Sequence, residues 1–238
     1  MKVLMSNDEI TMARAEMMDR DISYLDKPRP QLMGRAMKAL NMDRPVVGDY
    51  IKSWDVLETV KFLEANTDRQ APILDIGCYA SEVTLSLYKA GFTNLTGIDL
   101  DPNVSKMPLQ DQIRFVVGDF MKTDFEDESF QAITSISVIE HGFNPAALLS
   151  ETSRLLKPGG YFIASFDYWP EKIETAGIRI FGMDWLIFSK DDVDAMVSEA
   201  ANHGLFPVGE MNHEGQERPI KFSGFEYTFG WLALEKRN

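Results

Sequence analysis

Acidic residues follow apolar, β-rich runs of this sequence in settings suited to binding a nucleoside. Asp75 and Gly77 lie at the end of the run 73–76, where a glycine lets the backbone approach a ligand closely. The N–H groups at the start of the next helix are unpaired, and Asp75 could orient them or meet a cation. These features predict a cofactor loop.

Two further acidic positions extend this prediction to the nucleoside itself. Asp99 ends the run 95–98, roughly 20 residues after the first loop, where a carboxylate can accept hydrogen bonds from both ribose hydroxyls. Asp119 and Phe120 follow the run 113–117. There an acid can accept a hydrogen bond from an exocyclic amine, and an aromatic ring can stack on a purine.

The elements that must position these residues alternate along the chain. From residue 72 onward, short β-rich runs alternate with helical patterns, as is typical of βαβ units. The runs are 73–76, 95–98, 113–117, 132–136 and 161–165, and the helical patterns are 82–90, 145–156 and 189–203. We expect an α/β fold with a doubly wound, mostly parallel seven-stranded sheet and helices on both faces. A C-terminal antiparallel hairpin of residues 205–211 and 225–234 would complete it.

Two segments depart from this rhythm. Residues 1–54 are predicted to form a helical N-terminal extension, and residues 55–238 a Rossmann-like domain with an aromatic insertion at about 167–188. Ligands of open α/β sheets bind beyond the carboxyl ends of the strands, so this insertion could cover the binding site. Candidate pocket walls, equally suited to ordinary packing, are Tyr50, Trp54, Tyr168, Trp169 and Trp185.

The order and spacing of five motifs resemble those of class I, S-adenosylmethionine-dependent methyltransferases. The motifs are Leu74–Cys78, Gly97–Asp99, Gly118–Phe120, Ser137–His141 and Leu156–Gly160, and the resemblance covers about residues 55–166. It implies S-adenosylmethionine as cofactor and S-adenosylhomocysteine as product. It further implies that Asp75 and Gly77 line the methionine end, Asp99 holds the ribose, and Asp119 with Phe120 holds the adenine. The other implied cofactor residues are Cys78, Tyr79, Leu100 and Ser137.

The first loop departs from the family pattern of three glycines. Gly77 is followed by Tyr79 and Ser81 at the two later positions. Because side chains restrict positive φ, we expect a remodelled loop or a weaker affinity for the cofactor.

Glu140 and His141, after the fourth strand, are the candidate catalytic residues, since the resemblance places them near the transferred methyl group. His141 is preferred because the near-neutral intrinsic pKa of imidazole suits proton acceptance. A structural hydrogen bond is an equal alternative for each. No metal is expected, since the sequence has no paired cysteines and no HExxH motif, and two adjacent potential ligands do not define a site.

Composition limits the acceptor. The formal net charge of −13 opposes binding to nucleic acid and favours a small-molecule or glycan-like acceptor. With one cysteine and no apolar run near the roughly 20 residues that span a bilayer, we expect a cytoplasmic protein without membrane insertion. The oligomeric state is not encoded in any pattern that we recognise. A catalytically silent regulatory or assembly protein is the main alternative, and an NAD-dependent dehydrogenase, which would need the absent GxGxxG motif, is a lesser one.

Overall fold

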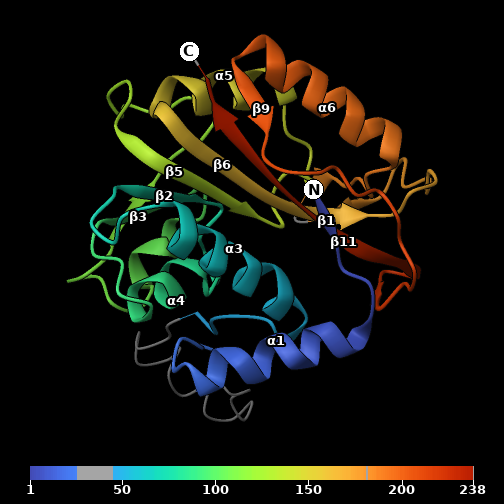
Figure 1. Cartoon of the computed structure of the whole chain (residues 1–238), viewed down its shortest axis with the longest axis horizontal. Coiled ribbons are helices and arrows are strands. Elements are labelled where there is room, and N and C mark those ends of the chain that lie inside the picture. The colour runs from blue at the N-terminus through green and yellow to red at the C-terminus, as the bar shows by residue number, and fades with distance from the viewer. Residues whose placement is uncertain (26–44, 181, 238) are drawn as a thin grey trace.

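The computed structural model describes residues 1–25, 45–180 and 182–237, and its centre is one twisted sheet (Figure 1). The strands of this sheet run in the order β1-β11-β6-β5-β2-β3-β4. Its parallel part comprises β2 (Ile73–Ile76), β3 (Leu95–Asp99), β4 (Arg114–Val117), β5 (Phe130–Ile136) and β6 (Leu156–Tyr168). The long strand β11 (Phe225–Lys236) pairs antiparallel with β6. The carboxyl ends of the parallel strands therefore share one edge, where the predicted cofactor residues lie.

Helices cover both faces of the sheet, as predicted. One face packs against α1 (Asn7–Asp19), α3 (Ser53–Asn66) and α4 (Val83–Lys89), and the other against α5 (Pro145–Leu155) and α6 (Lys190–Asn202) (Figure 1). Short 3-10 helices occupy Tyr50–Lys52 and Pro102–Lys106. Ser189 and Asp192 form the capping box that begins α6, which confirms the predicted start of this helix.

The C-terminal part of the sheet differs from the prediction. Within the described residues the sheet has nine strands rather than seven, because β1 (Lys2–Val3) and β10 (Ile220–Phe222) also join β11. The predicted strand 205–211 shortens to β9 (Leu205–Pro207), since Pro207 has no N–H to donate and Gly209 turns the chain with a φ of +74°. The tight hairpin is formed by β10 and β11 around Ser223 and Gly224, both in the left-handed region.

Two short strands cover the outer edge of β11. β1 pairs with Gly230 and Trp231, and β9 pairs with Leu234 to Lys236. Because β6 pairs with the same part of β11, β1 and β9 lie on the edge opposite β6. Lys2 and Val3, near the start of the predicted N-terminal extension, are thus part of the sheet, whereas residues 26–44 of that extension lie outside the described residues.

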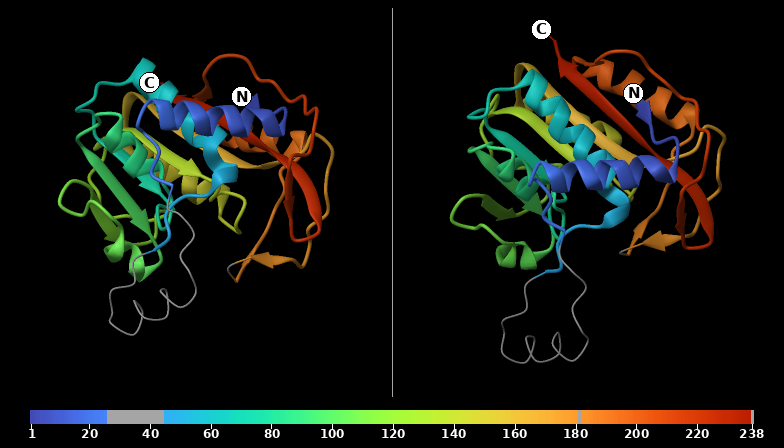
Figure 2. Two further views of the ribbon diagram at one scale, coloured as in Figure 1. Left: turned by 90° about the horizontal axis from the view of Figure 1, so that it is seen from below. Right: turned by 60° about the horizontal axis from the view of Figure 1, so that its bottom comes forward.

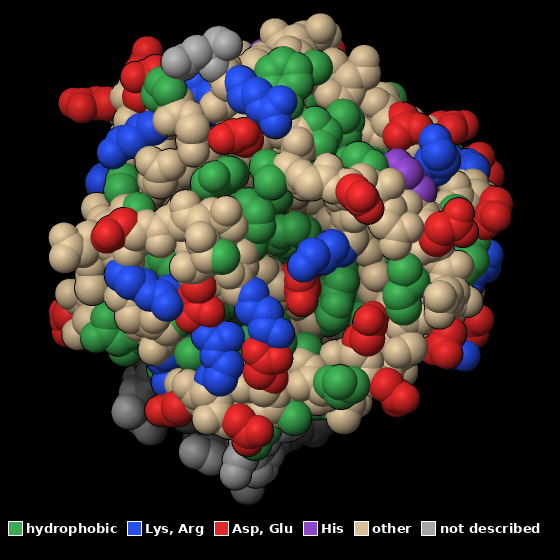
Figure 3. All heavy atoms as spheres, in the orientation of Figure 1, with side chains coloured by type: hydrophobic (Ala, Val, Ile, Leu, Met, Phe, Trp, Pro, Cys, Tyr) green, Lys and Arg blue, Asp and Glu red, His purple; other side chains and the backbone are tan. Residues whose placement is uncertain are grey.

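Opposite charges alternate on the outer surface of α1 and α3. Lys61 lies 2.6 Å from Glu16, and Arg20 lies 2.6 Å from Glu64. Figure 3, in the same orientation as Figure 1, shows Lys and Arg side chains interspersed with Asp and Glu side chains on this face. The described residues on the visible face therefore form no basic patch of the kind that binds nucleic acid.

Figure 2 shows the small hairpin of β7 (Arg179–Ile180) and β8 (Met183–Asp184) projecting from the body of the molecule. It belongs to the predicted insertion, although Asp167 and Tyr168 are the last residues of β6. Among the described residues, none of the helices has the length and apolar character needed to cross a membrane.

Candidate active site

Asp75 lies near the carboxyl end of β2 as a buried carboxyl group with an unused acceptor. It is 1% exposed, and its Oδ1 accepts a hydrogen bond of 2.7 Å from Thr134 Oγ1. Its Oδ2 has no hydrogen-bond partner among the described residues. Burial raises the pKa of Asp75 to about 7, because desolvation outweighs the Thr134 hydrogen bond. A positively charged or hydrogen-bond-donating ligand would satisfy this group.

The loop after β2 requires a glycine at its first turn. Gly77 has a φ of +71°, and a Cβ on it would lie 2.3 Å from Val138 Cγ2. The second left-handed position of the loop is Ala80, with a φ of +60°, whereas neither Tyr79 nor Ser81 has a positive φ. The two non-glycine residues therefore cause no backbone strain, and Ala80 takes the left-handed conformation instead.

We expect Gly77→Ala to destabilise the protein more than Gly91→Ala. Both glycines have positive φ, but a Cβ on Gly91, whose φ is +95°, meets no atom within 4 Å. The difference between the two variants therefore isolates the clash with Val138, for which we expect about 1–3 kcal/mol in the free energy of unfolding. Urea denaturation of both variants measures it, and equal losses would contradict this account of the loop.

Asp99, at the end of β3, accepts hydrogen bonds from residues of both the loop after β2 and the loop after β3. Its Oδ2 accepts a hydrogen bond of 2.8 Å from the Tyr79 backbone N–H, and its Oδ1 accepts one of 2.8 Å from Asp101. Each carboxylate oxygen has a second lone pair for a ligand hydroxyl. The adjacent Leu100 is 55% exposed, so its apolar side chain is accessible to a planar ring of a ligand.

The remaining predicted cofactor residues have mixed environments. Asp119 Oδ1 accepts a hydrogen bond of 2.9 Å from the Met121 N–H, and Phe120 is half-buried against the core. Cys78 is fully buried, and a Cβ on Gly97 would lie 2.6 Å from its Sγ. Burial raises the pKa of the Cys78 thiol, so this residue is a packing group rather than a nucleophile.

Glu140 and His141 follow β5 in a partly dehydrated environment. Glu140 is 1% exposed, and its Oε2 has no hydrogen-bond partner among the described residues. Burial and then the nearby Asp167 raise the pKa of Glu140 well above its ordinary value. Burial, assisted by Lys52, lowers the pKa of His141 to about 4. His141 is therefore a neutral imidazole at physiological pH, which is the form that can accept a proton.

Lys52 and Asp167 are charged residues of this site that the sequence analysis did not single out. The Lys52 ammonium contacts Ser137 Oγ, lies 3.9 Å from Asp167 Oδ1, and lies 3.5 Å from the ring centre of Phe229. Asp167 Oδ2 accepts a hydrogen bond of 2.8 Å from Trp185 Nε1. The signal for Asp167 was its place at the end of a strand, whereas nothing local distinguished Lys52 from a surface cation.

A third buried carboxyl group belongs to the same cluster. Asp55 accepts a hydrogen bond of 2.8 Å from Ser165 Oγ, and its burial raises its pKa to about 6 although Lys52 opposes the shift. Burial likewise raises the pKa of Asp167. Lys52 therefore acts electrostatically on three buried acids, Asp55, Glu140 and Asp167. We call these four residues the Lys52 cluster.

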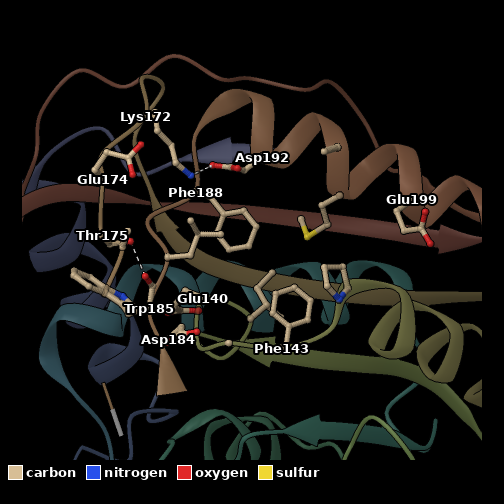
Figure 4. Close-up of a pocket in the computed structure, with 17 residues that line it drawn as sticks. Glu140, Phe143, Lys172, Glu174, Thr175, Asp184, Trp185, Phe188, Asp192 and Glu199 are labelled. Atoms are coloured by element: carbon tan, nitrogen blue, oxygen red, sulfur yellow. Dashed lines mark hydrogen bonds and ion pairs between the residues drawn. The ribbon is translucent and has the colours of Figure 1, made fainter. Parts of the chain in front are cut away.

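A pocket of about 600 Å³ lies between α6, the insertion and the segment that follows β5 (Figure 4). The lining residues from these elements include Ile139, Phe143, Trp185, Phe188 and Met196. We call it the α6 pocket. Its lining includes Glu140, so the pocket adjoins the segment that carries both candidate catalytic residues.

The five aromatic residues that we considered as pocket walls separate in the structure. Trp185 lines the α6 pocket, whereas Trp54 and Tyr168 are buried in the core. Tyr50 is 42% exposed, and Trp169 has the guanidinium of Arg218 above its ring at 4.1 Å. Among the described residues, no group of three or more His, Cys, Asp or Glu side chains is arranged to hold a metal ion.

Known proteins are similar to this chain in sequence and in fold. Residues 74–164 match the family model described as a methyltransferase domain. A sterol 24-C-methyltransferase of Debaryomyces hansenii is 34% identical over 173 residues, which cover 66% of this chain and 40% of that protein. A sterol 4-C-methyltransferase of Caenorhabditis elegans is 34% identical over 98 residues, covering 38% of this chain and 29% of that protein.

Solved structures agree in fold at low sequence identity. The cyclase SpnF has a TM-score of 0.62 at 15% identity, covering 89% of this chain and 97% of SpnF. An S-adenosylmethionine-dependent methyltransferase from Mesorhizobium loti has a TM-score of 0.54 at 15% identity, covering 74% of this chain and 96% of that one.

The motifs, the fold and the domain match agree on one class of protein. The chain carries a methyltransferase domain at residues 74–164 and resembles the class I, S-adenosylmethionine-dependent methyltransferases. It spans 26%, 28% and 40% of the lengths of three curated relatives that it matches.

Proposed function

We propose that this protein transfers a methyl group from S-adenosylmethionine to an apolar small molecule. The observation that carries the proposal is the grouping of Asp75, Gly77 and Asp99 at the carboxyl ends of neighbouring strands, within the matched methyltransferase domain. S-Adenosylmethionine would supply the methyl group on a sulfonium that is already a leaving group.

The residues of the first loops fit this cofactor. The unpartnered Asp75 Oδ2 suits the positively charged methionine end, and the glycine turn brings the backbone close to it. Asp99 retains lone pairs for the ribose hydroxyls, and Leu100 offers an apolar contact to the adenine. Asp119 and Phe120 would hold the other side of the adenine.

The protein's part in the reaction would be to position the acceptor, exclude water and remove a proton where the acceptor requires it. His141, neutral because of its lowered pKa, is one proton acceptor. Glu140 is the other, once it is ionised, and its free Oε2 is available to hold a proton.

The apolar character of the α6 pocket favours a hydrophobic acceptor over a glycan. The curated relatives support the same class, because several are named sterol methyltransferases. The sterol itself does not carry over, since the chain covers only 40% of the Debaryomyces hansenii protein.

Calorimetric titration with S-adenosylmethionine and S-adenosylhomocysteine tests the cofactor assignment. We expect saturable binding of both, no binding of NAD, and a loss of about 2 kcal/mol or more in binding free energy for Asp99→Ala, because a charged hydrogen-bond acceptor is removed. Asp111→Ala, on the exposed surface, serves as the control.

The alternatives predict different titrations. A silent regulatory protein of this fold would bind neither sulfur nucleotide or would bind without turnover, and a dehydrogenase would bind NAD. Binding of NAD in preference to S-adenosylmethionine would overturn the proposal.

A further inference from the structure

The interior of the α6 pocket is lined by buried apolar side chains, which suit a hydrocarbon ligand. Ile139 is 1% exposed, Phe188 is 3% exposed and Met196 is 6% exposed, so the pocket extends into the apolar core between the sheet and α6. The aromatic side chains of Phe143 and Phe188 both line it (Figure 4). Pockets of about 300–1,000 Å³ commonly enclose small organic molecules. The 600 Å³ of this pocket is therefore sufficient for one.

The rim of the pocket has an excess of negative charge. Lys172 is the one basic residue among the lining residues, and its Nζ lies 2.9 Å from Asp192, which neutralises it. Glu174, Asp184 and Glu199 are the other acidic residues of the rim, and Figure 4 shows Glu174 and Glu199 at opposite ends of the pocket. Glu199 lies 3.2 Å from His203 Nε2 and accepts a hydrogen bond of 3.0 Å from Asn202. Arg179, outside the lining, lies 3.4 Å from Asp184, but both side chains are well exposed and such pairs are weak. The net charge of the rim repels anions and attracts cations.

We propose that the α6 pocket binds an apolar amine. The hydrocarbon body of the ligand fills the interior, and its ammonium group stays hydrated at the rim beside the carboxylates. Both features of the ligand follow from the pocket. Burial of hydrocarbon in the apolar interior is favourable, and the exposed acidic rim favours a ligand with a positive charge.

The position of the pocket connects this ligand with the reaction. Its wall includes Ile139, Glu140 and Gly142, which come shortly after Ser137, the first residue beyond β5. We infer that the apolar amine is the methyl acceptor, a step that rests on the proposed function. The binding of an apolar amine to the pocket is independent of that step.

Three ligands of equal chain length test the pocket without any cofactor. Decylamine, 1-decanol and decanoate are titrated calorimetrically into the full chain below their micelle concentrations. We expect decylamine to bind most tightly and decanoate most weakly, with about a tenfold difference at low ionic strength that shrinks in salt. Binding of decanoate as tight as that of decylamine would overturn the proposal, as would absence of binding by all three.

Two variants locate the site. Ala195 is an exposed lining residue of α6, so Ala195→Trp fills the pocket without disturbing the core and should abolish binding of all three ligands. The triple variant Glu174→Gln, Asp184→Asn, Glu199→Gln should retain 1-decanol and lose the preference for decylamine over decanoate. Glu171→Gln, exposed but outside the lining, is the matched control. Unchanged binding in Ala195→Trp would show that the ligands bind elsewhere and would overturn the assignment.

The titrations also separate this inference from the proposed function. If decylamine binds as expected but S-adenosylmethionine does not, the proposed methyltransferase function is wrong and the proposed amine site stands. If S-adenosylmethionine binds but decylamine does not, the amine site is wrong and the cofactor assignment remains. If both bind, methylation of decylamine, detected by mass spectrometry, tests whether the pocket holds the acceptor, and no methylated product would overturn that last step.

Discussion

Arg14→Leu is expected to lower the free energy of unfolding by about 3–5 kcal/mol, because it leaves a buried carboxylate without its partner. Arg14 on α1 is 4% exposed, and its guanidinium contacts both carboxylate oxygens of Glu82, which is 2% exposed. Arg14 Nε also donates a hydrogen bond of 2.9 Å to Ser53 Oγ. Urea denaturation monitored by circular dichroism measures the loss.

Two further variants show whether the unpaired charge is responsible. Replacing both partners, Arg14→Leu with Glu82→Leu, should cost less than Arg14→Leu alone, because no buried charge is then left unpaired. Lys61→Met removes an exposed ion pair with Glu16 and should cost less than about 1 kcal/mol. A double variant as unstable as the sum of the two single variants would contradict this interpretation.

Lys52→Met is expected to reduce methyl transfer at neutral pH by about 100-fold, while leaving the affinity for S-adenosylmethionine nearly unchanged. Lys52 is a positioning residue in this prediction, because it acts through the charge of Glu140 and its neighbours. Attraction by the ammonium lowers the pKa values of Asp55, Glu140 and Asp167, in opposition to burial. Without it those pKa values rise further, so less of the carboxylate is ionised at pH 7.

The pH profile of kcat/KM distinguishes this role from simple packing. In Lys52→Met the acid limb should move to higher pH, and part of the activity should return as the pH rises. Lys52→Arg should restore most of it, because a cation is retained beside Ser137 and Asp167. An equal loss of activity at every pH, with an unmoved acid limb, would mean that Lys52 serves only to maintain the structure.

Local features of the structure could be predicted from the sequence, because they depend on residues that are close together in the chain. The turn after β2, the carboxylate at the end of β3 and the capping box of α6 each lie within a few residues, and the structure contains all three. The mostly parallel sheet with helices on both faces followed from the alternation of strands and helices, which local periodicity reveals. The conformation of the first loop did not follow, because whether Tyr79 or Ala80 takes the left-handed turn depends on packing.

The parts that were missed depend on contacts between distant residues. The side chains of Lys52 and Ser137 touch although they are 85 residues apart, and Arg14 meets Glu82 across 68 residues. β1 has only two residues, so no periodicity could reveal a strand that pairs with Gly230 and Trp231. Short strands and buried ion pairs of this kind become visible only when the chain is folded.

The placement of β1 and β9 has a consequence for self-association. β11 is a 12-residue strand rich in apolar residues, and its outer edge would otherwise offer unpaired N–H and C=O groups to a second molecule. β1 covers the middle of that edge and β9 covers its end. These two short segments, from opposite parts of the chain, therefore hinder edge-to-edge aggregation. Because Lys2 and Val3 are the whole of β1, a change at the first few residues would expose a template for strand addition.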